Sequence, residues 1–66
     1  MNEVIRTTFT AASHAVTVER LDRNRWRVLI DGRHFAIFCS ESRARTAGRA
    51  EARRLDFVAD DLASRR

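Results

Sequence analysis

The sequence contains no lysine, no proline and no tyrosine, and it has only one cysteine and two glycines among its 66 residues. Because Cys39 stands alone, no internal disulfide can form, and a reducing compartment, the cytoplasm, is the simplest expectation. The two glycines, Gly32 and Gly48, are too few for the glycine-rich loop that cradles a phosphate. These absences exclude a disulfide scaffold and a phosphate-loop nucleotide site.

Long apolar runs are missing as well. No stretch of about 18 apolar residues occurs, and residues 1–10 lack the basic start and apolar run of a secretory signal. We therefore expect a protein that is neither membrane-bound nor secreted. The length leaves room for one domain, residues 1–66, whose core is so small that such domains often depend on a disulfide, a metal or a partner subunit.

Residues suited to metal binding or catalysis are scarce. The soft ligands are His14, His34 and Cys39, whereas a structural zinc site needs four. His34 and Cys39 differ by five positions along one predicted strand, so their side chains point to opposite faces. We predict no metal, no cofactor, no catalytic residue and no small-molecule substrate, and we interpret Cys39 as a small core residue.

Three short segments alternate apolar and polar residues, as half-buried strands do. They are residues 14–20, 25–30 and 34–39. Residues 21–24 form a polar break between the first two, and Asp31-Gly32, a pair typical of type I′ hairpin turns, separates the last two. The pattern predicts an antiparallel meander.

The third predicted strand is apolar on both faces. Phe38 lies on one face, and Phe35 and Ile37 lie on the other. A strand of this kind should be buried on both sides. Residues 1–10, which include Phe9, can supply a further strand over the second face, or they can stay apart, because only a weak turn follows them.

Residues 41–64 predict one long helix. Ser40 is placed to cap its first turn, and only Gly48 lowers a helix propensity otherwise set by Ala, Arg, Glu and Leu. One arc of the helix is apolar except for Glu51; its members are Ala44, Ala47, Gly48, Ala52, Leu55, Val58, Ala59 and Leu62. The predicted fold class is α+β: a three-stranded antiparallel meander, with a possible extra N-terminal strand, packed against this helix. Trp26 and alternate residues of its strand face the helix.

The predicted helix is longer than the sheet. A six-residue strand spans about 20 Å, which about 13 helical residues cover, so close to half of the helix should extend beyond the strands. A partner would cover the apolar side chains of that half, and we expect a symmetric homodimer. The candidate interface residues are Phe35, Ile37, Leu55, Phe57, Val58 and Leu62. The alternative is a helix that ends near Asp56 and folds its tail back.

Arginine is the only basic residue besides histidine, and the net charge is +4. One interpretation is affinity for phosphate, which the planar guanidinium binds in a bidentate way. The other is a GC-rich coding bias without functional meaning. The candidate nucleic-acid-binding residues lie on or beside the first hairpin: Arg20, Arg23, Arg25, Arg27 and Arg33. A second basic group, Arg43, Arg45, Arg49, Arg53 and Arg54, precedes an acidic group, Asp56, Asp60 and Asp61, on the helix.

Part of the sequence resembles a known family. The run W-R-V at 26–28, Gly32, the run F-C-S-E-S-R-A at 38–44 and the Ala/Arg-rich helix after it are similar to the β-β-β-α arm-type DNA-binding domain of phage integrases. The same spacing also resembles a group of short bacterial proteins. The similarity covers about residues 16–55.

The resemblance implies that the sheet face turned away from the helix binds DNA through Arg25 and Arg27. Leu29, Phe35 and Ile37 depart from that pattern, because apolar side chains on this face fit a protein contact instead. Two non-enzymatic functions follow: a small nucleic-acid-binding accessory protein that uses an Arg-rich hairpin, or a homodimeric protein-interaction module with no nucleic-acid role.

Overall fold

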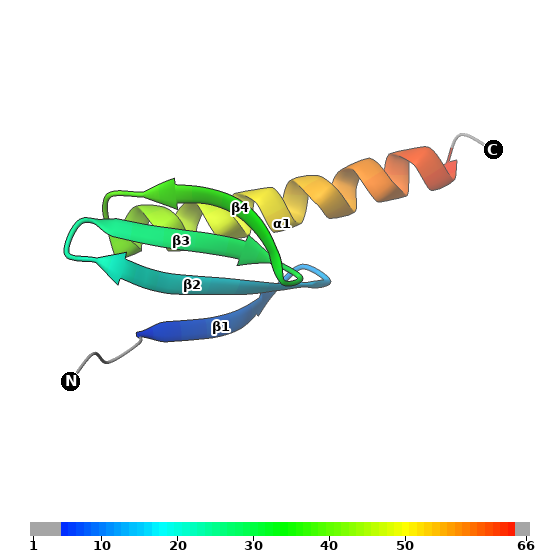
Figure 1. Ribbon diagram of the computed structural model, residues 1–66. Helices are drawn as coiled ribbons and strands as arrows, with labels where there is room; N and C mark the ends of the chain where they lie inside the picture. The colour runs from blue at the N-terminus through cyan, green and yellow to red at the C-terminus, as the bar shows by residue number, and fades with distance from the viewer. Residues whose placement is uncertain (1–4, 65–66) are drawn as a thin grey trace.

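The computed structural model of the chain describes residues 5–64, with side chains up to Ala59, and it forms an antiparallel sheet with one helix on one face (Figure 1). The elements are β1 (Arg6–Ala11), β2 (His14–Asp22), β3 (Arg25–Ile30), β4 (Arg33–Phe38) and α1 (Glu41–Ser64). The strands are ordered β1-β2-β3-β4, each paired with its neighbour in sequence. The predicted α+β meander is therefore confirmed, and the optional N-terminal strand is present.

Strand β1 does not lie where the sequence suggested. It pairs edge to edge with β2, with Phe9 opposite Val16, and it does not cover the second face of β4. Pairing with a free strand edge satisfies a row of backbone N–H and C=O groups, which packing on a sheet face cannot do. The turn before β2 places Ala12 at a φ of 53°, so its left-handed backbone compensates for the missing glycine.

The hairpin turns lie where the sequence predicts them, but strand β2 is longer than predicted. Asp31 and Gly32 both have positive φ, 52° and 82°, as a type I′ turn requires. Strand β2 continues to Asp22 through an irregular register after Arg20, two residues beyond the predicted end. Strand β4 stops before Cys39, which is exposed, so the interpretation of this thiol as a core residue is wrong.

A β-bulge changes which face of the sheet the side chains of β4 occupy. The register shifts between Val28 and Leu29 of β3, which leaves Phe35 as the extra residue of β4. Phe35 lines a hollow together with Leu55 of the helix, so it lies on the helix side. Its predicted place beside Ile37 on the opposite face is wrong, because a bulge interrupts the alternation of side chains. Ile37 remains on that opposite face and is 47% exposed.

The helix begins and ends as the sequence predicts. The Ser40 hydroxyl accepts a hydrogen bond from the backbone N–H of Arg43 at 3.2 Å, which is the expected N-cap. The helix passes Asp56 without a break and continues to Ser64. Within residues 5–64, no helix is long and apolar enough to span a membrane.

The core lies between α1 and the middle of the sheet. Its buried members are Val16, Val18, Val28, Ile30, Ala44 and Ala52. Trp26 packs against this core from the helix side of β3 and is only partly buried, which confirms its predicted face. Small residues of the helix meet large residues of the sheet, so the two layers approach closely.

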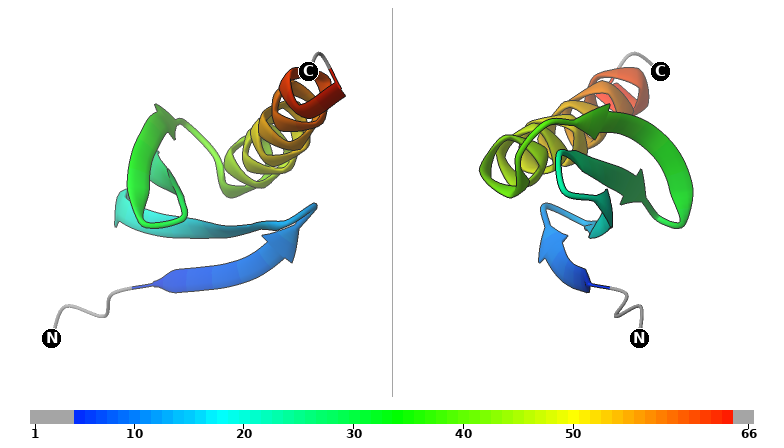
Figure 2. Two further views of the ribbon diagram at one scale, coloured as in Figure 1. Left: turned by 90° about the vertical axis from the view of Figure 1, so that its right-hand side faces the viewer. Right: turned by 60° about the vertical axis from the view of Figure 1, so that its left-hand side comes forward.

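The helix extends well past the sheet, and Figures 1 and 2 show its second half projecting beyond the strands. The molecule measures 53 × 17 × 15 Å along its principal axes. The projecting half carries Phe57 and Val58, whose exposed fractions are 72% and 41%. The predicted overhang is therefore present.

Candidate functional site

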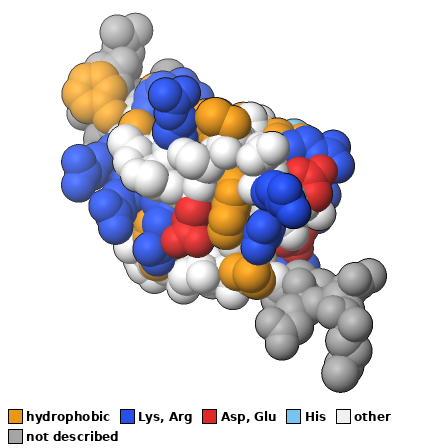
Figure 3. Space-filling model, turned by 90° about the vertical axis from the view of Figure 1, so that its left-hand side faces the viewer, with side chains coloured by type: hydrophobic (Ala, Val, Ile, Leu, Met, Phe, Trp, Pro, Cys, Tyr) orange, Lys and Arg blue, Asp and Glu red, His pale blue; other side chains and the backbone are white. Residues whose placement is uncertain are grey.

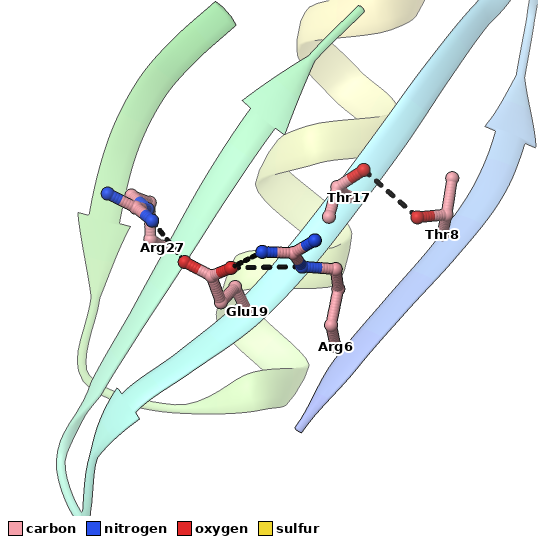
Figure 4. A network of polar contacts seen from close by, with 5 residues as sticks. All are labelled: Arg6, Thr8, Thr17, Glu19 and Arg27. Atoms are coloured by element: carbon pink, nitrogen blue, oxygen red, sulfur yellow. Dashed lines mark hydrogen bonds and ion pairs between the residues drawn. The ribbon is translucent and has the colours of Figure 1, made fainter. Parts of the chain in front are cut away.

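The sheet face turned away from α1 is called the open face here, and no element among residues 5–64 covers it. Figure 4 shows five of its side chains, with the helix behind the sheet. They are Arg6 and Thr8 from β1, Thr17 and Glu19 from β2, and Arg27 from β3. Register explains this grouping, because Glu19 lies opposite Arg6 on one side and opposite Arg27 on the other.

Glu19 holds two arginines together. Its carboxylate accepts a hydrogen bond from Arg6 Nε at 2.9 Å and others from the terminal nitrogens of Arg6 and Arg27. Glu19 is only 5% exposed, although the face around it is open. The hydrogen bonds from Arg6, and then those from Arg27, lower the pKa of this carboxyl below its ordinary value. The three side chains form an ionised cluster with a net charge of +1.

Sequence reasoning named Arg27 but missed its partners. Glu19 could have been found, because it alternates with Val18 and falls on the outward face of the hairpin opposite Arg27. Arg6 could not, since its place depends on the pairing of β1, which the sequence left open.

The five predicted nucleic-acid-binding arginines do not form one patch. Arg25 lies on the open face and forms an ion pair with Asp22 at 2.5 Å, while Arg23 is exposed in the adjoining turn. Arg20 lies on the helix side, where its Cζ atom is 5.8 Å from the centroid of the Trp26 ring. Arg33 begins β4 at the opposite end of the sheet.

Instead, the fold joins the hairpin arginines to those of the helix start. Strand β4 ends opposite the start of β3, and α1 begins there, so one end of the molecule combines both groups. We call it the basic end. Among the described residues it carries seven arginines, Arg6, Arg20, Arg23, Arg25, Arg27, Arg43 and Arg45, and three carboxylates, Glu19, Asp22 and Glu41. Figure 3 views the molecule from this end, and basic side chains predominate over acidic ones.

The predicted interface residues are divided among several surfaces. Phe57 and Val58 are exposed on the overhanging helix, and Leu55 is partly buried beside the hollow. Ile37 is on the open face, and Phe35 is on the helix side. The side chain of Leu62 is outside the described residues.

A second polar cluster joins the opposite end of the sheet to the helix. His14 Nδ1 lies 2.5 Å from Asp31 Oδ2, and His14 Nε2 lies 2.9 Å from Asp56 Oδ1. Ser13 donates to Asp56 from its backbone N–H at 2.9 Å and from its hydroxyl at 2.5 Å. The hydrogen bond to Asp31 is the main cause that raises the pKa of His14. Asp56 therefore connects the helix to the turn before β2.

This cluster stabilises the fold and does not resemble a catalytic site. Both nitrogens of His14 contact carboxylates, so the ring has no free nitrogen that could activate a nucleophile. The adjacent hollow of about 490 Å³ is lined by His14, Ile30, Asp31, Arg33, His34, Phe35, Glu51 and Leu55. Within the described part of the chain, no group of three or more His, Cys, Asp or Glu side chains is arranged to hold a metal ion.

No family model matches the chain, and no curated protein or solved structure matches it either.

Proposed function

We propose that this chain is a small non-enzymatic protein that binds nucleic acid through its basic end, in the cytoplasm. The observation that supports this proposal is the grouping of seven arginines with only three carboxylates at one end of the described structure. A cluster of guanidinium groups attracts the phosphate backbone and steers a polyanion to that surface. The seven arginines less the three carboxylates give this end a charge of +4, which equals the net charge of the whole chain.

The dimensions of the open face also suit contact with nucleic acid. The four strands together are about 14 Å wide at the usual strand spacing, slightly more than the major groove of DNA, which is about 12 Å wide, so this face would lie over the groove and reach the phosphates beside it. Glu19 positions the guanidiniums of Arg6 and Arg27 on this face without neutralising both of them. Leu29 and Ile37 are the neighbours of Arg27 on this face, along β3 and across to β4, and can contact thymine methyl groups or sugars.

Fluorescence anisotropy with a labelled 20-base-pair duplex, measured between 50 and 200 mM salt, tests the proposal. We expect binding that weakens with salt. A plot of the logarithm of the association constant against the logarithm of the salt concentration should have a slope of about −0.9 for each phosphate contact; it is called the log-log slope below. Replacing Arg23 and Arg25 together by Gln should reduce the slope by up to about 1.8 units. The control replaces Arg33 and Arg54 by Gln. It removes the same charge from β4 and α1 outside the basic end, and it should leave the slope nearly unchanged.

A wild-type protein that shows no binding to the duplex at 50 mM salt would contradict the proposal. Equal effects of the two double variants would show that binding responds to net charge and not to the basic end. A single strand and an RNA duplex of the same length, measured in parallel, identify the preferred nucleic acid.

A second candidate function is self-association through the overhanging helix, which is compatible with the first. The observation that favours it is the exposure of Phe57 and Val58 on a helix half that contacts little of the sheet. Leu55, one helical turn before Val58, lines the hollow together with Phe35. A two-fold partner that places its own helix along this half would remove these side chains from water, which is favourable for each large apolar side chain.

A further inference from the structure

We propose that Arg45 and Arg49 form a binding site for the phosphodiester backbone of nucleic acid, organised by the ring of Phe9. The proposal depends on the proposed function and identifies a second contact region for the same ligand. This region lies between β1 and the helix, and neither arginine was among the nucleic-acid-binding residues predicted from the sequence.

The geometry of this site brings two cations to one ring. The Cζ atoms of Arg45 and Arg49 lie 5.5 and 5.4 Å from the centroid of the Phe9 ring. The two guanidinium groups are therefore no farther apart than the sum of these distances. Phe9 is partly buried and packs against the core, so the ring is a fixed support. Successive phosphates of one strand can contact both groups.

The charge at this site is poorly compensated. Arg45 approaches Glu41 at 3.8 Å, with both side chains substantially exposed, and Arg49 has no ion pair within residues 5–59. Two like charges one helical turn apart repel each other. The carboxylate of Glu51 does not help, because it is bonded to Arg54 on the other flank of the helix. A bound phosphate would remove the repulsion.

The donors at this site are available for a phosphate. Arg49 is exposed and the side chain of Arg45 is 40% exposed, although the Nε atom of Arg45 is itself buried and out of a ligand's reach. A contact through the ring face is electrostatic and leaves most of the five N–H donors of each guanidinium unused. Guanidinium donors match phosphate oxygens in a bidentate arrangement. On the β1 side the neighbouring helix-facing residue is Thr7, which is neutral and offers a hydroxyl.

The site is continuous with the basic end. Arg45 belongs to both, since it lies in the first turns of α1. A nucleic acid bound at the hairpin can therefore extend around the start of the helix to the edge formed by β1. The total contact surface is then larger than the open face alone, and its phosphate contacts come from β1–β3 and from α1.

The test is the salt dependence of duplex binding for the variant R45Q/R49Q, in which both arginines are replaced by glutamine. Loss of two phosphate contacts should reduce the log-log slope by about 1.8 and weaken binding at 0.1 M salt by more than tenfold. The variant R45K/R49K retains the charge and should retain most of the slope. The variant R33Q/R54Q loses the same charge elsewhere and is the matched control. Circular dichroism melts establish that each variant is folded.

The outcomes separate this inference from the proposed function. If the wild type does not bind the duplex, both are wrong. If R23Q/R25Q reduces the slope but R45Q/R49Q does not, the Phe9 site is wrong and the basic end remains. Equal effects of R45Q/R49Q and R33Q/R54Q would also overturn the site. Wild-type binding to phosphatidylglycerol vesicles without binding to the duplex would show that the phosphate belongs to a lipid and would overturn it.

Discussion

Gly48 of the helix lies directly against Val16 of β2. A Cβ atom at position 48 would be 2.6 Å from Val16 Cγ1, closer than real side chains come, and 3.2 Å from Val28 Cγ1, which is a tight contact. The close approach of α1 to the sheet therefore requires a residue without a side chain at this position.

Replacing Gly48 by Ala should destabilise the protein by about 1–3 kcal/mol, because overpacking displaces the helix or the two valines. In an open helix position the same change would stabilise by about 1 kcal/mol, so the sign of the effect is diagnostic. Urea unfolding measures it. The control is Ala50→Gly on the exposed face, which should cost about 1 kcal/mol from helix propensity alone.

Replacing Glu19 by Gln should cost about 1–2 kcal/mol, because it leaves two guanidinium groups without their shared acceptor. The partly exposed arginines can turn to water, which limits the loss. The folded-state pKa of Glu19 is lowered, so its contribution is present above the unfolded pKa and is lost as the pH falls through the folded pKa. The variant should therefore lose less stability than the wild type between pH 5 and pH 3. If the variant and the wild type lose equal stability between pH 5 and pH 3, the ion pairs of Glu19 contribute nothing to the stability of the fold.

The stability of the protein should decrease as the pH rises from 6 to 8. Hydrogen bonding to Asp31 raises the pKa of His14 above 6.5, so the stabilisation is complete below the unfolded pKa and is lost as the pH rises through the folded pKa. Thermal melts across this range should show a falling Tm for the wild type and a flatter profile for His14→Gln. The variant His34→Gln is the control, and it should follow the wild type.

Light scattering should report a dimer, about twice the 7.6 kDa mass of the chain, at tens of micromolar. Val58→Arg places a charge on the projecting helix and should shift the protein to monomer. Ala50→Arg adds the same charge on the first half of the helix and should leave the assembly intact. A monomeric wild type would exclude association through this helix at these concentrations.

Local sequence patterns were sufficient to predict the hairpins and the helix. Period-two alternation located three strands, and the N-cap at Ser40 with a favourable composition located both ends of the helix. The turn at Asp31 followed from its sequence, because few residue pairs accept positive φ in both positions. By contrast, the turn at Ala12 has no such signature, and the pairing of β1 was left open.

The parts that depended on three-dimensional contacts were not predictable in the same way. The bulge that reorients Phe35 belongs to the pairing of β4 with β3, and alternation alone cannot show it. His14 contacts Asp31 only when β2 pairs with β3, and it contacts Asp56 only when α1 is docked on the sheet. The Phe9 site likewise needs both the pairing of β1 and the direction of the helix.

The order β1-β2-β3-β4 has a kinetic consequence. Each strand pairs with the one next to it in the chain, so the sheet can form by successive closure of short loops, each with a small entropic cost. Domains dominated by such contacts fold fast for their size, commonly within milliseconds. The chain contains no proline, so no isomerisation of a prolyl bond can delay refolding. Refolding of the monomer unit is thus expected to be a single fast phase, and any slow phase would report association of chains.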